Sequence, residues 1–349
     1  FIGFLYLIIH LVQISSLDQI RRLDAPIRVF LLSGLIALPV ISGRPLQDYK
    51  SAFAISGITF GVITIFQFME NNQAGRYFGF YGYHNLMALA ALTNTITLLW
   101  LLKEKVYGIE KYLILIGILG GITACLLSGT RASWILIIIT MTFYLANHKE
   151  YDISKRLTTV LFCILFFVGT VLLLDSFDAR FQSTITDINN ISNGDRSGSI
   201  GLRLTMAEMA FSRIAEHPWI GNGLSDFHQE ITRWADSRNM PADAMERGFQ
   251  NSHHQFLHWA QSLGIPCAVL ATYMLLVWPL KIGKSVQDIS SKLLKIFVFV
   301  CLLFFVTEAV LDRHHGSMWY AAHLGLLLGF VLHARQKSSP QESVVDALT

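Results

Sequence analysis

The sequence is poor in charged residues. Only 15% of its 349 residues are Asp, Glu, Lys or Arg, whereas a soluble domain usually carries about 25%. Hydrophobic residues make up 53%, and long apolar runs recur along the chain. These runs exclude a globule with a single core and predict a membrane protein with several spans. The length of the runs favours helices, because only helices and closed barrels satisfy their backbones in lipid.

Cysteines and cofactor motifs are also scarce. The four cysteines, Cys125, Cys163, Cys267 and Cys301, all lie in apolar runs. Neither a disulfide framework nor a Cys-x-x-Cys metal pair is therefore indicated. The sequence contains no phosphate-binding loop, no dinucleotide-binding glycine pattern and no His-Glu-x-x-His zinc motif. We expect no cofactor and no nucleic-acid partner.

The sequence predicts an all-α, polytopic protein of about ten spans. The chain starts at Phe1 inside an apolar run, so we expect it to be trimmed at the N-terminus. The predicted spans are 1–15 (a partial helix), 27–42, 51–69, 84–102, 112–127, 132–147, 157–175, 264–281, 294–311 and 317–333.

These spans divide the chain into four parts. Transmembrane helices are expected in 1–175, a polar loop domain with short helices in 176–262, C-terminal transmembrane helices in 263–333 and a cytoplasmic tail in 334–349. Threading ten spans puts all eleven lysines on one face, which the positive-inside rule makes cytoplasmic. The opposite face, periplasmic in a bacterium, receives the polar segment 176–262 and many arginines, although Arg21 and Arg22 also fall there. Glu308 and Asp312 should open to this outer face, with Arg313 as a possible ion-pair partner.

Arg131 is the only charged residue between Gly120 and Ala146. The run from Tyr112 to Ala146 is too long for one span and is typical of a helical hairpin that turns at Ser128-Gly129-Thr130. Arg131 then lies at the outer lip of the membrane. It either snorkels at a helix end or binds an anion, because a guanidinium is suited to bidentate contacts with phosphate.

The segment 176–262 has two predicted helices before the histidine stretch. One apolar face, formed by Leu202, Met206, Met209 and Ile214, predicts a helix that Pro218 ends, with Arg203 in its first turn. A glycine-rich bend and a second short helix, SDFHQEITRWAD, follow. Asn189 to Gly201 is predicted to be a loop.

The stretch NSHHQFLHWAQSLGIP carries two candidate catalytic histidines. Ser252 and Gln255 fit a capping box, which predicts a helix that starts at His253. In the first turn the helix dipole would keep His253 neutral, as a general base requires. His254 remains an alternative to His253.

A metal site is a further alternative. His254 and His258 share one helical face, and His314 and His315 lie in another outer loop, so four imidazoles could bind zinc or copper. No carboxylates cluster near them in the sequence, and this alternative is the weaker one.

Four stretches resemble, in order, motifs of the bacterial O-antigen ligase and O-antigen polymerase family of GT-C glycosyltransferases. RYFGFYGYHN resembles its Arg-x-x-Gly signature with a later Asn, here Arg76, Gly79 and Asn85. SGTRASW resembles its Ser-Arg-Gly-Ala turn, and the stretch 201–227 resembles its arginine-bearing helix followed by Pro-x-x-Gly-x-Gly. HHQFLHWAQSLGIPC resembles its histidine motif, with His253 in the histidine position. Two departures are His254, where the family has a small polar residue, and Cys267, where it has a second glycine.

The resemblance implies an O-antigen ligase in the bacterial inner membrane with its site at the periplasmic face. It implies transfer of glycan from undecaprenyl diphosphate to a lipid A-core hydroxyl with inversion and without metal. His253 or His254 would be catalytic, and Arg131, Arg203 and Arg76 would hold the diphosphate. The resemblance also implies O-antigen polymerase and protein-O-glycosylating ligase as alternatives. A transporter of a lipid-linked anion is disfavoured, because the predicted spans are nearly free of charge.

Overall fold

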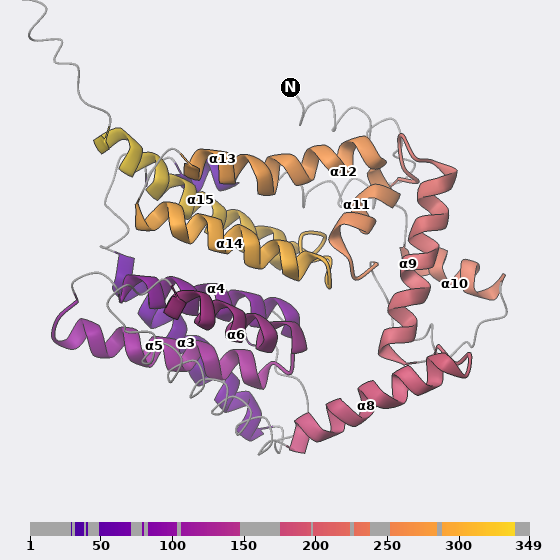
Figure 1. Ribbon diagram of the computed structural model, residues 1–349, viewed down its shortest axis with the longest axis horizontal. Coiled ribbons are helices and arrows are strands. Elements are labelled where there is room, and N and C mark those ends of the chain that lie inside the picture. Colours follow the sequence, from indigo (N-terminus) through magenta and orange to yellow (C-terminus); the bar gives the residue numbers. More distant parts are fainter. Residues whose placement is uncertain are drawn as a thin grey trace, which may run out of the picture.

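A computed structural model describes the protein at residues 29, 32–37, 40, 49–70, 79, 83–102, 106–146, 175–196, 198–223, 227–237, 252–284 and 288–338. Every regular element in these ranges is a helix, which confirms the predicted all-α class (Figure 1). The helices are α3 (Lys50–Glu70), α4 (His84–Leu101), α5 (Ile109–Leu127), α6 (Arg131–Ala146), α8 (Asp175–Ser192), α9 (Ser199–Glu216), α10 (Phe227–Asp236), α11 (Gln255–Leu263), α12 (Ile265–Thr272), the π-helical turn η4 (Tyr273–Val277), α13 (Trp278–Lys284), α14 (Ile289–Phe305) and α15 (His314–Ser338).

The protein is a multi-pass membrane protein. Within the described ranges, four helices are long and apolar enough to cross a bilayer: Lys50–Glu70, Ile109–Leu127, Ile265–Lys284 and His314–Gln336. The predicted spans 84–102 and 132–147 coincide with α4 and α6. The span 1–15 lies outside the described residues, as do 157–174 and most of 27–42, so the total of ten stays a prediction.

Helix α4 forms the centre of the helical bundle. Every residue of α4 after His84 is buried, and α4 packs against α3, α5, α6, α14 and α15. Beside it, α3 and α5 approach at backbone distance through glycines. A Cβ atom on Gly57 would lie 2.3 Å from the Gly117 carbonyl oxygen, and one on Gly61 would lie 2.6 Å from the Gly120 Cα. Small residues of this kind allow close helix packing in membranes, where burial of apolar surface does not drive association.

The predicted hairpin between α5 and α6 is confirmed. Helix α5 ends at Leu127 and α6 begins at Arg131. Gly129 adopts a φ of 65° in the turn, which glycine tolerates without a steric cost. The Ser133 hydroxyl and the Trp134 indole N–H both donate to the Cys125 carbonyl oxygen, at 3.4 and 3.2 Å. These contacts hold the start of α6 against the end of α5.

Helices α8 to α11 gather at one end of the long helices, where α9 lies across the ends of α11 and α12 (Figure 1). The predicted apolar face of α9 is confirmed by the burial of Leu202, Met206 and Met209. Helix α9 ends at Glu216, two residues before Pro218, and α10 matches the second predicted short helix. The predicted loop from Asn189 to Gly201 is wrong in extent, because α8 continues to Ser192 and α9 begins at Ser199.

Candidate active site

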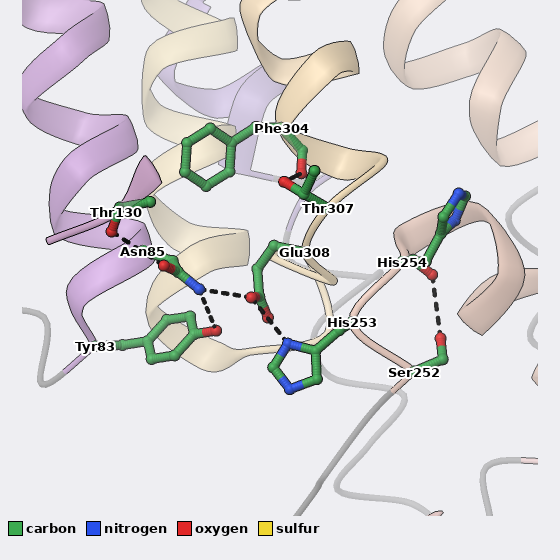
Figure 2. Close-up of polar contacts among 9 residues, drawn as sticks. All are labelled: Tyr83, Asn85, Thr130, Ser252, His253, His254, Phe304, Thr307 and Glu308. Atoms are coloured by element: carbon green, nitrogen blue, oxygen red, sulfur yellow. Dashed lines mark hydrogen bonds and ion pairs between the residues drawn. The ribbon is translucent and has the colours of Figure 1, made fainter. Parts of the chain in front are cut away.

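A cluster of polar side chains lies where three distant segments of the chain meet. Tyr83 and Asn85 stand at the start of α4, and His253 lies just before α11. Glu308 lies in the loop between α14 and α15, which spans residues 306–313. Figure 2 shows Glu308 between Asn85 and His253. These segments adjoin the end of the bundle that carries α9 and α11.

Glu308 is the centre of this cluster. Its side chain is 1% exposed, and its Oε2 atom lies 3.0 Å from His253 Nδ1. Asn85 Nδ2 donates to the same oxygen at 2.6 Å and approaches the Tyr83 hydroxyl at 2.9 Å. A buried carboxylate is costly unless it is paired and hydrogen-bonded. At Oε2 an imidazole and an amide supply that compensation.

The cluster reaches the turn that precedes Arg131. The Thr130 hydroxyl donates to Asn85 Oδ1 at 3.1 Å (Figure 2). The Asn85 side chain therefore uses its oxygen toward Thr130 and its nitrogen toward Glu308. The turn of the α5–α6 hairpin and His253 are thus joined through two intermediate side chains, Asn85 and Glu308.

The surroundings of Glu308 favour its ionised form. Burial by itself would raise the pKa of this carboxyl. The hydrogen bond and charge of His253, a hydrogen bond from Tyr83 and the charge of Arg313 outweigh burial and lower the pKa to about 2. The pKa of Tyr83 is raised, first by burial and then by the negative charge of Glu308. Glu308 is consequently an anion, and Tyr83 a neutral phenol, at physiological pH.

Arg313 completes the cluster without the expected direct ion pair to a carboxylate. Its guanidinium carbon lies 3.9 Å from the centroid of the Tyr83 ring, a cation–π contact. Glu308 and Asp312 were predicted to open to the outer face. Glu308 is instead buried at 1% exposure and contacts His253, whereas Asp312 is 29% exposed and contacts His258.

The predicted capping box at His253 is wrong. Helix α11 begins at Gln255, and its N-cap is His254, whose Nδ1 accepts from the Leu257 N–H at 3.3 Å. The Ser252 hydroxyl instead donates to the His254 carbonyl oxygen at 3.2 Å. His253 precedes the helix with a φ of 51°, a left-handed conformation that is uncommon for a residue with a Cβ atom. The carboxylate of Glu308, rather than a position in the first turn, is therefore the group that orients His253.

The two candidate histidines point in different directions. Figure 2 shows the His253 ring directed toward Glu308 and the His254 ring turned away from it. Burial lowers the pKa of His254, so its ring is neutral and can accept the Leu257 N–H. His253 has the geometry of a base backed by a carboxylate, and His254 has that of a helix cap.

A second histidine–carboxylate pair joins the same two segments. His258 Nε2 lies 3.0 Å from Asp312 Oδ1. Between the two pairs, Gln255 Oε1 accepts from the Leu311 N–H at 2.7 Å. Three polar contacts thus fasten the loop 306–313 to residues 253–258.

The predicted arginines are only partly placed. Arg76 lies outside the described residues. Arg131 is the first residue of α6, next to Thr130 of the cluster, but its side chain is also outside the description. Arg203 is exposed. It was predicted in the first turn of its helix, but α9 begins at Ser199, so Arg203 opens the second turn. Among the described side chains, no group of three or more His, Cys, Asp or Glu has the geometry to hold a metal ion, and His258 is paired with Asp312.

Sequence reasoning missed the partnership of Glu308 with His253. Its only signal was an acidic residue at the end of an apolar run, which is a functional candidate by default in a membrane protein. Asn85 was part of a motif, but the spacing of that motif does not reveal contacts with Thr130 and Glu308.

One family of known proteins matches the part of the chain that contains the α5–α6 hairpin, α9 and His253. Residues 113–272 match the O-antigen ligase family. The resemblance read from the sequence motifs is thereby confirmed: in residues 113–272 this multi-pass membrane protein is similar to the O-antigen ligase family. The match to the O-antigen ligase family includes Arg131, Arg203 and His253, whereas Asn85 and Glu308 lie outside it. An uncharacterised protein of Haemophilus influenzae is 22% identical over 334 residues, which cover 88% of this chain and 79% of that protein.

Proposed function

We propose that this protein is an O-antigen ligase. It transfers a glycan from undecaprenyl diphosphate to a sugar hydroxyl of lipid A-core at the periplasmic face of the inner membrane. The observation that carries the proposal is the contact between His253 and buried Glu308, inside a chain whose residues 113–272 match the O-antigen ligase family. In this proposal residues 176–262 are periplasmic and 334–349 are cytoplasmic.

His253 is the proposed general base. A proton on Nδ1, donated to Glu308, places the basic lone pair on Nε2. Nε2 then takes the proton from the attacking hydroxyl of the acceptor. The anionic carboxylate also stabilises the imidazolium that forms during the attack. The hydroxyl oxygen bonds to the anomeric carbon while the bond to the diphosphate breaks, so a single displacement inverts the anomeric centre.

The leaving diphosphate requires positive charge at the same end of the bundle. Arg131 is our first candidate, because Thr130, directly before it, contacts Asn85 and through it Glu308. Arg203 and Arg76 are further candidates for binding the diphosphate. A guanidinium offers two parallel N–H donors to phosphate oxygens, and its charge is most effective in a site with little water. The proposed transfer requires no cofactor and no metal ion.

Lipopolysaccharide from a deletion strain tests the proposal. Loss of the O-antigen ladder, together with accumulation of polymer on undecaprenyl diphosphate, is expected for a ligase. Complementation with the wild-type gene should restore the ladder, and complementation with His253→Ala should not. A single added repeat unit on lipid A-core would instead identify a polymerase. An unchanged lipopolysaccharide ladder with loss of glycan from a protein would identify a protein-O-glycosylating ligase.

A further inference from the structure

The bend that follows α9 exposes two large apolar side chains. We define the apolar bend as residues 217–223. Within it, Trp219 is 76% exposed and Ile220 is 54% exposed. Neighbouring exposed apolar side chains of this size are typical of a surface that binds a partner or a membrane.

The apolar bend is fixed to the junction between α11 and α12. The Ile265 N–H donates to the Pro218 carbonyl oxygen at 2.8 Å, and the Asn222 N–H donates to the Gln261 carbonyl oxygen at 2.8 Å. The two backbones pass so closely that a Cβ atom on Gly264 would lie 2.3 Å from the Trp219 carbonyl oxygen. The apolar bend therefore has one position relative to the start of α12.

That position is the end of a membrane span. The apolar span Ile265–Lys284 has the smallest buried share of the four candidate spans, 22%. Ile265, Val269 and Tyr273 follow one another at intervals of four, and they are 45%, 63% and 37% exposed. Residues at this interval share a helix face, so the start of this span has an exposed apolar face of the kind that contacts lipid. Trp219 and Ile220 lie beside the first residue of this face and continue its apolar character.

We propose that the apolar bend inserts Trp219 and Ile220 into the lipid surface of the bilayer, at the level where α12 enters it. Tryptophan is enriched at this level, because its ring is apolar and its N–H is polar. The apolar bend is hydrogen-bonded to the last turn of α11, and His253 lies just before the first turn of the same helix. Insertion therefore sets the depth of His253 relative to the membrane surface, where a lipid-linked donor carries its diphosphate.

Spin labels on introduced cysteines test this contact in the full chain reconstituted into lipid nanodiscs. The native cysteines are first replaced by alanine. Ile220→Cys is compared with Val269→Cys, which is expected to face lipid, and with Glu208→Cys on an exposed, charged position of α9. We expect the label at 220 to be accessible to oxygen and protected from a water-soluble nickel reagent. Its ratio of oxygen accessibility to nickel accessibility should lie between the ratios of the labels at 269 and 208.

Two results would overturn the proposal. A label at 220 that is as accessible to nickel as the label at 208 would place the apolar bend in water. A label shielded from both reagents would place it against protein, such as a second copy of this chain. The measurement does not use glycan transfer, so its result is independent of whether the chain is a ligase.

Discussion

Two histidine–carboxylate pairs join the same two segments at the same distance, 3.0 Å, but their burial is reversed. In the first pair Glu308 is 1% exposed and His253 is 17% exposed. In the second pair the histidine is the more buried partner: His258 is 8% exposed, and Asp312 is 29% exposed. A buried carboxylate behind a more open imidazole can orient a base for an incoming hydroxyl. A buried imidazole behind a more open carboxylate is suited to fastening one segment to the other.

The backbone conformations of His253 and His258 also distinguish the two pairs. His258 is a helical residue of α11, whereas His253 has a φ of 51°. Conformations of this kind cost free energy and tend to be retained at functional sites. The first pair is connected, through Asn85 and Thr130, to the turn before Arg131. The first pair therefore has the features of a reactive site and the second those of a structural contact.

The largest expected effect is that of His253→Ala. Loss of a general base should lower kcat for transfer roughly 10²- to 10⁴-fold, while binding of the lipid-linked donor survives. The measurement is transfer by the purified protein with a lipid-linked donor and lipid A-core, with donor binding measured separately. His258→Gln is the matched control and should retain most of its kcat. Equal losses of kcat in the two variants would contradict the assignment of His253 as reactive and His258 as structural.

Replacement of the two carboxylates should also have unequal effects, with the larger loss of kcat at Glu308 and the smaller at Asp312. Glu308→Gln keeps the shape of the side chain but loses the charge that selects the Nδ1–H tautomer of His253. Removing the carboxylate that orients a metal-bound histidine costs roughly 10- to 100-fold, and we use the same range for Glu308. We expect this loss in kcat with a nearly unchanged KM for the acceptor, and a much smaller loss for Asp312→Asn. A loss confined to KM would assign Glu308 to acceptor binding instead.

Arg131→Lys tests the connection between the first pair and the α5–α6 turn. Lysine keeps the positive charge but loses the two-pronged donor set. One charge-assisted hydrogen bond contributes roughly 1.5–3 kcal/mol, which corresponds to about a 10- to 100-fold slower transfer.

The control for Arg131→Lys is Arg233→Lys, at an exposed position of α10, which should transfer normally. If Arg131 and Arg203 grip one diphosphate, the double lysine variant should lose less than the product of the two single losses. Near-normal transfer by Arg131→Lys would make Arg131 a membrane anchor.

The apolar helices were the more predictable part of this molecule, although the span predicted at 294–311 is displaced: α14 begins at Ile289 and ends at Phe305. Apolar length placed α3, α4, α5, α6 and α15 within a few residues, because desolvation in lipid leaves few alternatives to a helix. The hairpin turn followed from three small polar residues between apolar runs. The end of α9 followed from Pro218, which cannot continue a helix.

The pairing inside the candidate site was not predictable from local patterns. His253 and Glu308 are separated by 55 positions, and Asn85 and Glu308 by 223. Their contact depends on how the helices pack, which a single sequence does not reveal. The capping box failed for a different reason: the His254 ring competes with the Ser252 hydroxyl for the role of N-cap, and a motif that considers only Ser and Gln omits that competitor.

Acid should destabilise the protein through Glu308 more than through Asp312. The pKa of Glu308 is about 2 in the folded protein, below the ordinary value of 4.5. Ionised Glu308 therefore contributes stability that is complete above about pH 4.5 and is lost as the pH falls toward 2. The Tm of the wild-type protein should fall over this range more steeply than that of Glu308→Gln. Asp312→Asn should keep most of the wild-type slope, and equal flattening in both variants would contradict the prediction.

The smallest expected effect is that of His254→Ala. The His254 ring caps α11 through the Leu257 N–H, and loss of an N-cap costs about 0.5–2 kcal/mol of stability. We therefore expect a lower Tm with transfer reduced only a few-fold. His254→Asn should recover the Tm, because an asparagine side chain accepts the same kind of hydrogen bond at an N-cap. If His254→Ala lost as much transfer as His253→Ala at an unchanged Tm, or if added zinc restored it, His254 would be a reactive group or a metal ligand. The separation of His253 as base from His254 as cap would then be wrong.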